Sequence, residues 1–263
     1  MKKIKYFKLF SNEKTIDLEE IVRKKLLDSD ILEKEDNYDI AIAIGGDGTF
    51  LKMVSETYFD SNILYVGINA GTLGFAQEIN IDEIDNFISS LKTNNYKIEE
   101  IGIEETIIKT ETKEDKIYSL NEIVIREKEL NTLFLDISID EIFLEQFVGD
   151  GILVSTSFGT TAYNLSFGGS IIFSTFHALE ITPIAPLHNK VYKSLINPII
   201  IPEGKEIKII PTKKRSILLT IDGKNRTYNE VLSIITKIDK KRIKCYRNNN
   251  YNFFKKVNDK FLK

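Results

Sequence analysis

Residues 40–50 read Ile-Ala-Ile-Ala-Ile-Gly-Gly-Asp-Gly-Thr-Phe. An apolar run typical of a buried strand gives way here to three glycines and one aspartate. Glycines after a strand let backbone amides converge, and a helix starting there adds the positive end of its dipole, so phosphate oxygens are the expected ligand. Asp47 places an anion beside them. It either holds a metal ion, accepts a proton from a group about to be phosphorylated, or simply caps a tight turn.

This turn matches neither common phosphate-binding fingerprint. It lacks the lysine of a P-loop and the Gly-x-Gly-x-x-Gly spacing of dinucleotide-binding folds. A second glycine-rich block, Gly67–Phe75, follows another apolar strand. Because adjacent parallel strands end at the same edge of a sheet, we expect both blocks at the edge where open α/β sheets bind ligands.

The first part of the chain alternates strand and helix signals. Apolar spacing predicts strands at 3–10, 38–44 and 63–68, and helices at 16–32, 50–57 and 81–91, with Thr49 as a candidate cap. This order predicts an α/β N-terminal domain, residues 1–96, with a parallel sheet covered on both sides.

After about residue 94 the pattern changes to short, alternating, β-branched segments. They predict an all-β domain over residues 97–249, with a hairpin-type turn at Asp222-Gly223 and one helix near 160–167. The predicted strands are 97–111, 116–127, 132–139, 142–148, 199–201, 206–210, 216–221 and 232–237. Residues 250–263 resemble an amphipathic tail helix, which we expect to pack back on the first domain.

Glycine placement indicates where a ligand binds. Of 14 glycines, six fall between Gly45 and Gly74 and five between Gly149 and Gly169. Glycine destabilises regular elements, so each cluster marks a place where the backbone bends sharply or approaches a ligand. Because one cluster falls in each predicted domain, we expect the ligand in a cleft between the two.

Asn121 and Glu122 interrupt an apolar segment, which we predict as a continuous strand over residues 117–125. Adjacent strand residues point to opposite faces, so one of the two should point inward, where a polar group needs a partner. The alternative is the solvent face of an edge strand.

The block from Gly149 to Gly169 passes from a strand at 152–155 through a run of hydroxyl residues into a helix near Thr160. Hydroxyl groups at a helix start can bind ligand oxygens, and aromatic residues in this run can stack on a base. A capped helix with a Gly-Gly stop is the alternative. Farther on, the prolines of residues 181–186 predict a stiff extended loop that forms a wall.

Composition excludes several classes of protein. The 263 residues carry 36 basic and 39 acidic side chains, a formal charge of −3, which argues against bulk nucleic-acid binding. Cys245 is the only cysteine, so no disulfide forms within the chain, which suits a reducing cytoplasm. The N-terminus has no signal-peptide core, and no apolar run approaches the roughly 20 residues of a membrane span. We therefore expect a cytoplasmic protein that contacts no membrane.

Taken together, these blocks resemble the NAD kinase family over about residues 38–223. The Gly-Gly-Asp-Gly turn is shared with diacylglycerol and sphingosine kinases and phosphofructokinases, whereas the later blocks are more specific. The resemblance implies a sandwich-like C-terminal domain, a homodimer or homotetramer, and ATP-dependent phosphorylation of the 2′-hydroxyl on the adenosine ribose of NAD, with Mg²⁺ accompanying ATP. We assign no metal ligand in the chain, and whether Asp47 also contacts the metal stays open. Polyphosphate as donor and the choice between NAD and NADH stay open.

The resemblance also implies roles for individual residues. Asp47 matches the general base, in a turn that includes Gly46 and Gly48. Asn121 and Glu122 match groups that hold the adenosine portion, and Asp150 a carboxylate in the nicotinamide half. The remaining implied substrate-binding residues are Asn69 and Phe75 in the second glycine-rich block, Thr161, Ala162, Tyr163 and Ser166 in the hydroxyl run, and Ala185 in the wall. Phe158 is a further substrate-binding candidate from its residue type, because its ring can stack on a base. The chain departs from the family at Ser157-Phe158 and at Thr160, which leaves the shape of the nicotinamide pocket open.

Two other functions fit parts of the sequence. A lipid kinase of the diacylglycerol type shares the glycine turn but needs an apolar acceptor cleft, which the hydroxyl run does not favour. A non-catalytic dinucleotide sensor would keep Asn121, Glu122 and Tyr163, and would have no need of Asp47.

Overall fold

The protein is described by a computed structural model that covers residues 3–71, 74–129, 131–213 and 216–263. The chain forms two compact units, one made of Met1–Ile101 with Arg242–Lys263 and one made of Gly102–Lys241. Two long strands, β6 (Lys97–Thr110) and β17 (Val231–Arg247), belong partly to each. Each unit has its own hydrophobic core, as expected of a domain.

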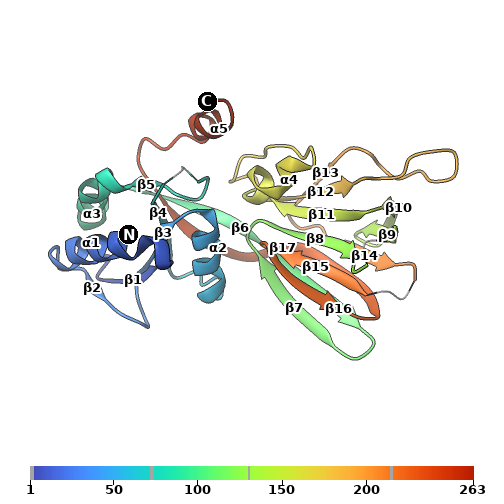
Figure 1. Cartoon of the computed structure of the whole chain (residues 1–263), viewed down its shortest axis with the longest axis horizontal. Helices are drawn as coiled ribbons and strands as arrows, with labels where there is room; N and C mark the ends of the chain where they lie inside the picture. The colour runs from blue at the N-terminus through green and yellow to red at the C-terminus, as the bar shows by residue number, and fades with distance from the viewer. Residues whose placement is uncertain (1–2, 72–73, 130, 214–215) are drawn as a thin grey trace. The chain divides into compact units, whose positions relative to one another are not determined.

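The first unit is an α/β domain (Figure 1). Its sheet has the strand order β2-β1-β3-β4 followed by the end of β17, with β5 also paired to β4, and all of these pairs are parallel. In chain order its elements are β1 (Tyr6–Phe10), η1 (Glu13–Thr15), α1 (Ile16–Leu27), β2 (Leu32–Glu33), β3 (Ile40–Gly45), α2 (Asp47–Glu56), β4 (Leu64–Asn69), β5 (Ile79–Asn80), η2 (Ile81–Glu83), α3 (Ile84–Thr93) and α5 (Phe253–Phe261).

Strand β3 lies at the centre of this domain and is buried along its whole length. Ile40, Ile42 and Ile44 share a core with residues of α1 and α3. Alternate residues of a strand face opposite sides, so Ala41 and Ala43 face the other way. Figure 1 shows α2 on the other side of β3 from α1 and α3. The large residues of β3 therefore face α1 and α3, and its small residues face the side on which α2 lies.

The second unit consists of strands and short helical turns. Its elements are β7 (Glu114–Ser119), β8 (Glu122–Glu127), β9 (Leu133–Ile139), β10 (Ile142–Gly149), β11 (Gly151–Thr156), η3 (Gly159–Thr161), α4 (Tyr163–Ser166), β12 (Ala178–Ile184), β13 (Ile199–Pro202), β14 (Ile207–Pro211), β15 (Ile217–Ile221) and β16 (Lys224–Tyr228). One sheet has the antiparallel order β13-β12-β11-β8-β15-β16. The other strands join β6 and β17 in a second sheet.

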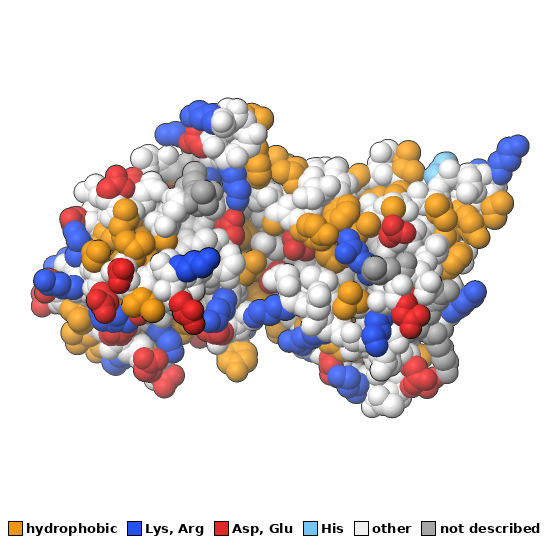
Figure 2. All heavy atoms as spheres, in the orientation of Figure 1, with side chains coloured by type: hydrophobic (Ala, Val, Ile, Leu, Met, Phe, Trp, Pro, Cys, Tyr) orange, Lys and Arg blue, Asp and Glu red, His pale blue; other side chains and the backbone are white. Residues whose placement is uncertain are grey.

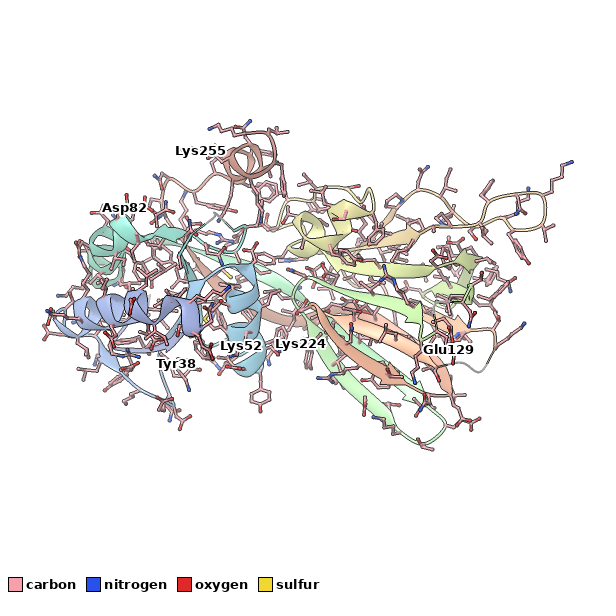
Figure 3. All side chains as sticks on the ribbon, viewed as in Figure 1. Tyr38, Lys52, Asp82, Glu129, Lys224 and Lys255 are labelled. Atoms are coloured by element: carbon pink, nitrogen blue, oxygen red, sulfur yellow. The ribbon has the colours of Figure 1, made fainter. Side chains whose placement is uncertain are left out.

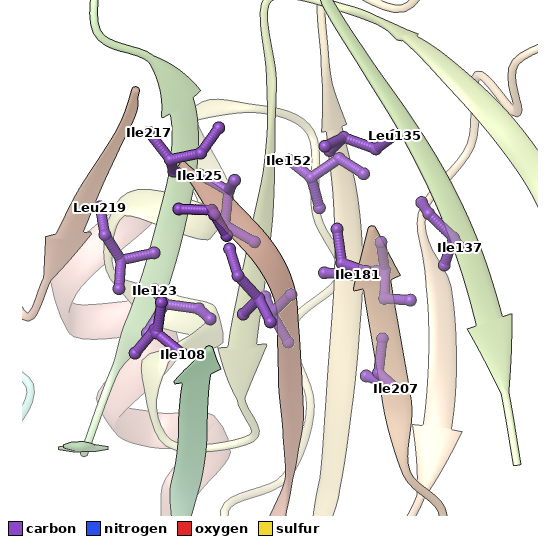
Figure 4. Packing of buried hydrophobic residues seen from close by; sticks show 14 of the residues in the cluster. Ile108, Ile123, Ile125, Leu135, Ile137, Ile152, Ile181, Ile207, Ile217 and Leu219 are labelled. Atoms are coloured by element: carbon purple, nitrogen blue, oxygen red, sulfur yellow. The ribbon is translucent and has the colours of Figure 1, made fainter. Parts of the chain in front are cut away.

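The two sheets of this unit share one core. Figure 4 shows Ile152 of the first sheet near Leu135 of the second, and Ile123 of the first sheet near Ile108 of the second. Side chains from two facing sheets filling a common interior is the arrangement of a sandwich. The predicted fold class, an α/β domain followed by an all-β sandwich-like domain, is confirmed.

Charge on the molecular surface is mixed. Figure 2 shows Lys and Arg side chains interspersed with Asp and Glu over the viewed face. This distribution agrees with the near balance of 36 basic and 39 acidic residues, and on that face no large region of one sign is present.

Candidate active site

Asp47 is the first residue of α2, immediately after the β3 strand and its glycines. Gly46 caps the helix with an extended backbone, so the expectation that Thr49 caps it was wrong. The Thr49 hydroxyl instead accepts a hydrogen bond from the Asn12 side chain at 3.3 Å. The same hydroxyl explains why residue 45 is a glycine, because a Cβ at Gly45 would lie 2.5 Å from Thr49 Oγ1. The turn thus starts the helix three residues earlier than the apolar pattern indicated.

The Asp47 carboxylate is held by three donors. Oδ1 accepts the backbone amide of Ala76 at 2.8 Å, and Oδ2 accepts that of Phe75 and the Lys260 ammonium, both at 3.0 Å. Burial works to raise the pKa of Asp47, but these two amides and the charge of Lys260 outweigh it, so the pKa lies below its ordinary value. Asp47 is therefore ionised at neutral pH and fixed in orientation.

The glycines around Asp47 serve two different purposes. A Cβ at Gly46 or Gly48 would meet no atom of the described residues within 4 Å, so packing among these residues does not demand glycine there. Gly74, by contrast, leaves room for the carboxylate, because a Cβ there would lie 2.3 Å from Asp47 Oδ1. The open positions suit the close approach of a ligand to the α2 N-terminus.

The second glycine-rich block follows β4, which pairs in parallel with β3 and sets Asn69 opposite Gly45. The prediction that both blocks leave the same sheet edge is confirmed. The Asn69 side chain accepts from the Gly71 amide at 3.0 Å and donates to Asn80 at 3.2 Å, which holds the start of the loop. Thr72 and Leu73 of this block lie outside the described residues.

Gln77 follows this loop and is buried. It is 1% exposed, yet neither its amide nitrogen nor its carbonyl oxygen has a hydrogen-bond partner among the described residues. Its Oε1 lies 1.7 Å from the point where a Gly74 Cβ would be, beside Asp47. A buried amide without partners is costly, so this group next to Asp47 is a candidate for contact with a ligand.

Helix α5 packs on the loop that carries Phe75. The Phe75 ring contacts those of Phe253 and Phe261, with centroids 5.6 and 6.3 Å apart. Lys256 donates to the carbonyl of Gln77. Phe75 is thus buried beneath α5, and its predicted part in lining the substrate cleft stays a prediction.

The prediction that Asn121 and Glu122 lie within one continuous strand was wrong. The chain bends between β7, which ends at Ser119, and β8, which begins at Glu122. The Asp222 carboxylate accepts the consecutive backbone amides of Leu120, Asn121 and Glu122, at 2.8, 2.8 and 3.2 Å. These bonds take up the donors that a continuous strand would have paired with its neighbours.

Three carboxyl groups come close together beside this bend. Burial, with the charges of Asp222 and Glu104, raises the pKa of Glu122 to about 8. Burial likewise raises the pKa of Glu104 to about 8 and that of Asp222 to about 6, the latter against the effect of the three amides. Glu122 Oε2 is buried without a partner among the described residues. Glu122 can therefore carry a proton at neutral pH and either donate to a ligand hydroxyl or accept from it.

The hydroxyl run forms a tight turn against the same bend. Gly159 packs on Asn121, because a Cβ there would lie 2.1 Å from the Asn121 carbonyl oxygen. Phe158 and Thr161 are buried, Ala162 is half-buried, and Tyr163 and Ser166 are exposed on α4. Burial of Phe158 leaves Tyr163 as the exposed ring available for stacking.

The region of residues 181–186 is not a loop. Residues up to Ile184 form β12, a strand inside the six-stranded sheet, so the prediction of an extended loop was wrong. Pro183 lies beyond residues 178–181, the part of β12 that pairs with β13, so its missing N–H costs no hydrogen bond to that strand. Ala185 adopts a positive φ of 44°, and the amide of Asp150 donates to the carbonyl of Ile184 at 3.0 Å. Asp150 and Ala185, both exposed, are thus brought together as predicted site residues.

Sequence comparisons identify the family of these two domains. A family model described as the ATP-NAD kinase N-terminal domain matches residues 2–96, and its C-terminal counterpart matches residues 120–241. The chain belongs to the NAD kinase family. An NAD kinase of Finegoldia magna is 39% identical over 229 residues, which is 84% of this chain and 84% of that protein. The chain is therefore an enzyme of the NAD kinase type.

Two solved structures share the fold. Yeast NADH kinase complexed with NADH has a TM-score of 0.87 at 20% identity and covers 98% of this chain and 88% of that one. An NAD kinase from Archaeoglobus fulgidus in complex with ATP has a TM-score of 0.74 at 19% identity, covering 96% of this chain and 98% of that one. At these identities the likeness concerns the fold.

The NAD kinase motifs did not lead to Lys260, Gln77 or the carboxylate of Asp222. The sequence indicated that Asp222 is a turn residue. No neighbouring residue indicated from which backbone amides its carboxylate would accept hydrogen bonds. Lys256 and Lys260 are four residues apart, hence on one face of a helix, and Phe253 lies on that face too. Two lysines on the apolar face of an amphipathic helix are unusual, and this pattern in the sequence could have indicated a role for Lys260.

The described residues contain no group of three or more His, Cys, Asp or Glu side chains arranged to hold a metal ion. None of their helices is long and apolar enough to span a membrane.

Proposed function

We propose that this enzyme transfers the γ-phosphoryl group of Mg-ATP to the 2′-hydroxyl on the adenosine ribose of NAD, giving NADP. The observation that carries the proposal is the oriented, ionised carboxylate of Asp47 at a helix start flanked by two open glycines. The NAD kinases among the relatives support the reaction, and the two solved structures, one complexed with NADH and one with ATP, support a nicotinamide dinucleotide and ATP as ligands.

Asp47 acts as the general base in this proposal. The ribose 2′-oxygen forms a bond to the γ-phosphorus, the bond from that phosphorus to the β-bridging oxygen breaks, and ADP leaves. The hydroxyl proton passes to Asp47. Phosphoryl transfer requires mainly positioning and charge neutralisation, with the proton leaving late, so a carboxylate of lowered pKa is adequate.

Mg²⁺ enters as part of the Mg-ATP substrate. In kinase sites this ion usually keeps several waters and is held largely by substrate phosphate oxygens. Bound in this way, Mg²⁺ neutralises phosphate charge. The chain's contribution is to orient Asp47 and to expose the amides at the start of α2 next to Gly46 and Gly48.

The second domain binds the acceptor. Asn121 and Glu122 hold the adenosine portion, and the protonation range of Glu122 lets it donate to a ribose hydroxyl or accept from one. Thr161, Ala162, Tyr163 and Ser166 bind the base and the neighbouring ribose, with the exposed ring of Tyr163 stacking. Asp150 and Ala185 serve the nicotinamide half, shaped by the buried Phe158. Asn69 and Phe75 are the remaining substrate-binding residues. The functional enzyme is a homodimer or homotetramer.

Incubation of the purified protein with Mg-ATP and NAD tests the proposal. We expect NADP as the product, recognised by an NADP-specific dehydrogenase that does not accept the 3′-phosphate isomer. Parallel reactions with polyphosphate and with NADH establish the donor and acceptor preferences. Absence of NADP, or a 3′-phosphorylated product, would refute the assignment.

A further inference from the structure

The glycine-rich turn presents a charge problem that its own sequence does not solve. Phosphoryl transfer next to a carboxylate needs positive charge near the moving phosphoryl group. The turn contains no lysine, and Lys52 of α2 is exposed and lies 3.7 Å from Glu56. The cation must therefore come from another part of the chain or from Mg²⁺ alone.

The structure brings Lys260 to this position. Its Nζ lies 3.0 Å from Asp47 Oδ2, although 213 residues separate the two in sequence. The Lys260 and Asp47 side chains are 24% and 36% exposed, so the pair is partly shielded from water yet open on one side. An ion pair in that setting is stronger than a fully exposed one and still reachable by a ligand.

The placement of Lys260 does not depend on the ion pair itself. Helix α5 is anchored by Phe253 and Phe261 against Phe75, and by the buried Lys256. Lys256 also lies 3.5 Å from Glu78. These contacts fix the helix, so its last turn holds Lys260 over Asp47 even when the ammonium changes partners.

Lys260 has room to change partners. Its ammonium carries three donors, and no described atom lies within 4 Å of where a Cβ at Gly46 or Gly48 would be. Asp47 keeps its orientation through the amides of Phe75 and Ala76 when Lys260 moves away. Departure of the lysine would free one acceptor position on Oδ2.

We propose that Lys260 is a catalytic residue that binds the transferring phosphoryl group: it pairs with Asp47 in the free enzyme and moves onto phosphate oxygens when Mg-ATP is bound. Oδ2 of Asp47 then accepts the proton of the ribose hydroxyl as the oxygen–phosphorus bond forms and ADP leaves. The C-terminal helix thereby supplies the cation that the glycine turn lacks. This inference rests on the proposed phosphorylation of NAD.

Replacement of Lys260 by Met, which keeps the length of the apolar stem, tests the idea. We expect Lys260→Met to lower kcat about 10²–10³-fold, the range for losing one donor that stabilises developing charge, with NAD affinity by calorimetry unchanged. Lys260→Arg, which keeps the charge, should recover at least about a tenth of the wild-type kcat. Lys255, labelled in Figure 3, is exposed on the same helix, and Lys255→Met is the matched control with wild-type turnover.

The pH dependence of kcat/KM distinguishes a catalytic role of Lys260 from a merely structural one. The charged groups that face Asp47 are Lys260 and, on the same helix, Lys256, whose pKa burial lowers to about 8 against the opposing effect of Glu78 and Asp47. Loss of the Lys260 charge raises the pKa of Asp47, so the acidic limb of kcat/KM should move to higher pH in Lys260→Met.

The outcomes are distinct. Near-normal kcat in Lys260→Met overturns the proposal for Lys260, and so does a loss of activity with an unmoved acidic limb and no recovery in Lys260→Arg. Failure of the wild-type protein to form NADP instead overturns the proposed function. Thermal unfolding of each variant identifies any that has lost its fold, in which case Lys260→Gln is assayed by the same criteria.

Discussion

The carboxylate of Asp222 accepts a hydrogen bond from the backbone amide of Asn121 at 2.8 Å, although 101 residues separate them along the chain. The same carboxylate accepts the amides of Leu120 and Glu122. A hairpin-turn residue therefore shapes the bend that presents two proposed substrate-binding side chains.

Asp222→Asn should weaken the acceptor site. The substituted amide nitrogen cannot accept a hydrogen bond, so at least one buried backbone amide loses its partner, at a cost of about 1–3 kcal/mol. We expect KM for NAD to rise roughly tenfold while KM for ATP stays near its wild-type value. Asp140→Asn is the matched control, because Asp140 is also a turn residue whose carboxylate accepts a backbone amide, that of Glu206 at 2.9 Å. Equal effects on both KM values would contradict a specific role for Asp222.

Asp47→Asn should impair chemistry and leave binding intact. The amide keeps the shape of the side chain but cannot accept the ribose proton, and general-base assistance is worth about 10²–10⁴-fold. We expect kcat to fall at least about 10²-fold, measured by steady-state formation of NADP, with NAD binding unchanged by calorimetry. Near-normal turnover would rule out the base role.

Gly74→Ala should act through Asp47. The added Cβ would lie 2.3 Å from Asp47 Oδ1 and 1.7 Å from Gln77 Oε1, so the carboxylate or the loop must shift. We expect a loss of kcat of at least about tenfold, since small misplacements of catalytic groups are costly. In an Asp47→Asn background the same change should cost much less, because coupled residues are not additive. Additive losses in kcat would show that Gly74 matters for another reason.

Glu104→Gln should alter how stability depends on pH. Glu104 is fully buried, its oxygens accept from Ser119 and Thr236, and burial raises its pKa to about 8. With a folded pKa above the unfolded one, its contribution is complete below about pH 4.5 and is lost as the pH rises through about 8. The variant should therefore melt at a higher temperature than wild type at pH 9 and gain little at pH 5.

Thermal unfolding across that range measures the effect. For a chain of this size each kcal/mol corresponds to about 2–4 °C in Tm. A difference in Tm that stays constant from pH 5 to pH 9 would show that the carboxyl group does not titrate as described.

Local pattern accounts for much of the fold. The apolar run before Gly45 forms β3, and the parallel neighbour β4 ends beside it, as the spacing of the two glycine-rich blocks indicated. Errors occurred where a distant group overrode a local pattern. Residues 117–125 read as one strand, because no local signal shows that Asp222 will take up the amides of Leu120 and Asn121. Prolines made residues 181–186 look like a loop, although β12 continues to Ile184.

The sequence by itself determined the α/β and all-β order, the glycine turn with its aspartate, and the family. Those features depend on residue type and short spacing, which the backbone geometry of strands, turns and helices converts directly into local structure. Only the tertiary structure decided that Lys260 meets Asp47 and that Asp222 holds the bend at Asn121. Such contacts join residues far apart in the chain, and their partners follow from how buried surfaces pack together.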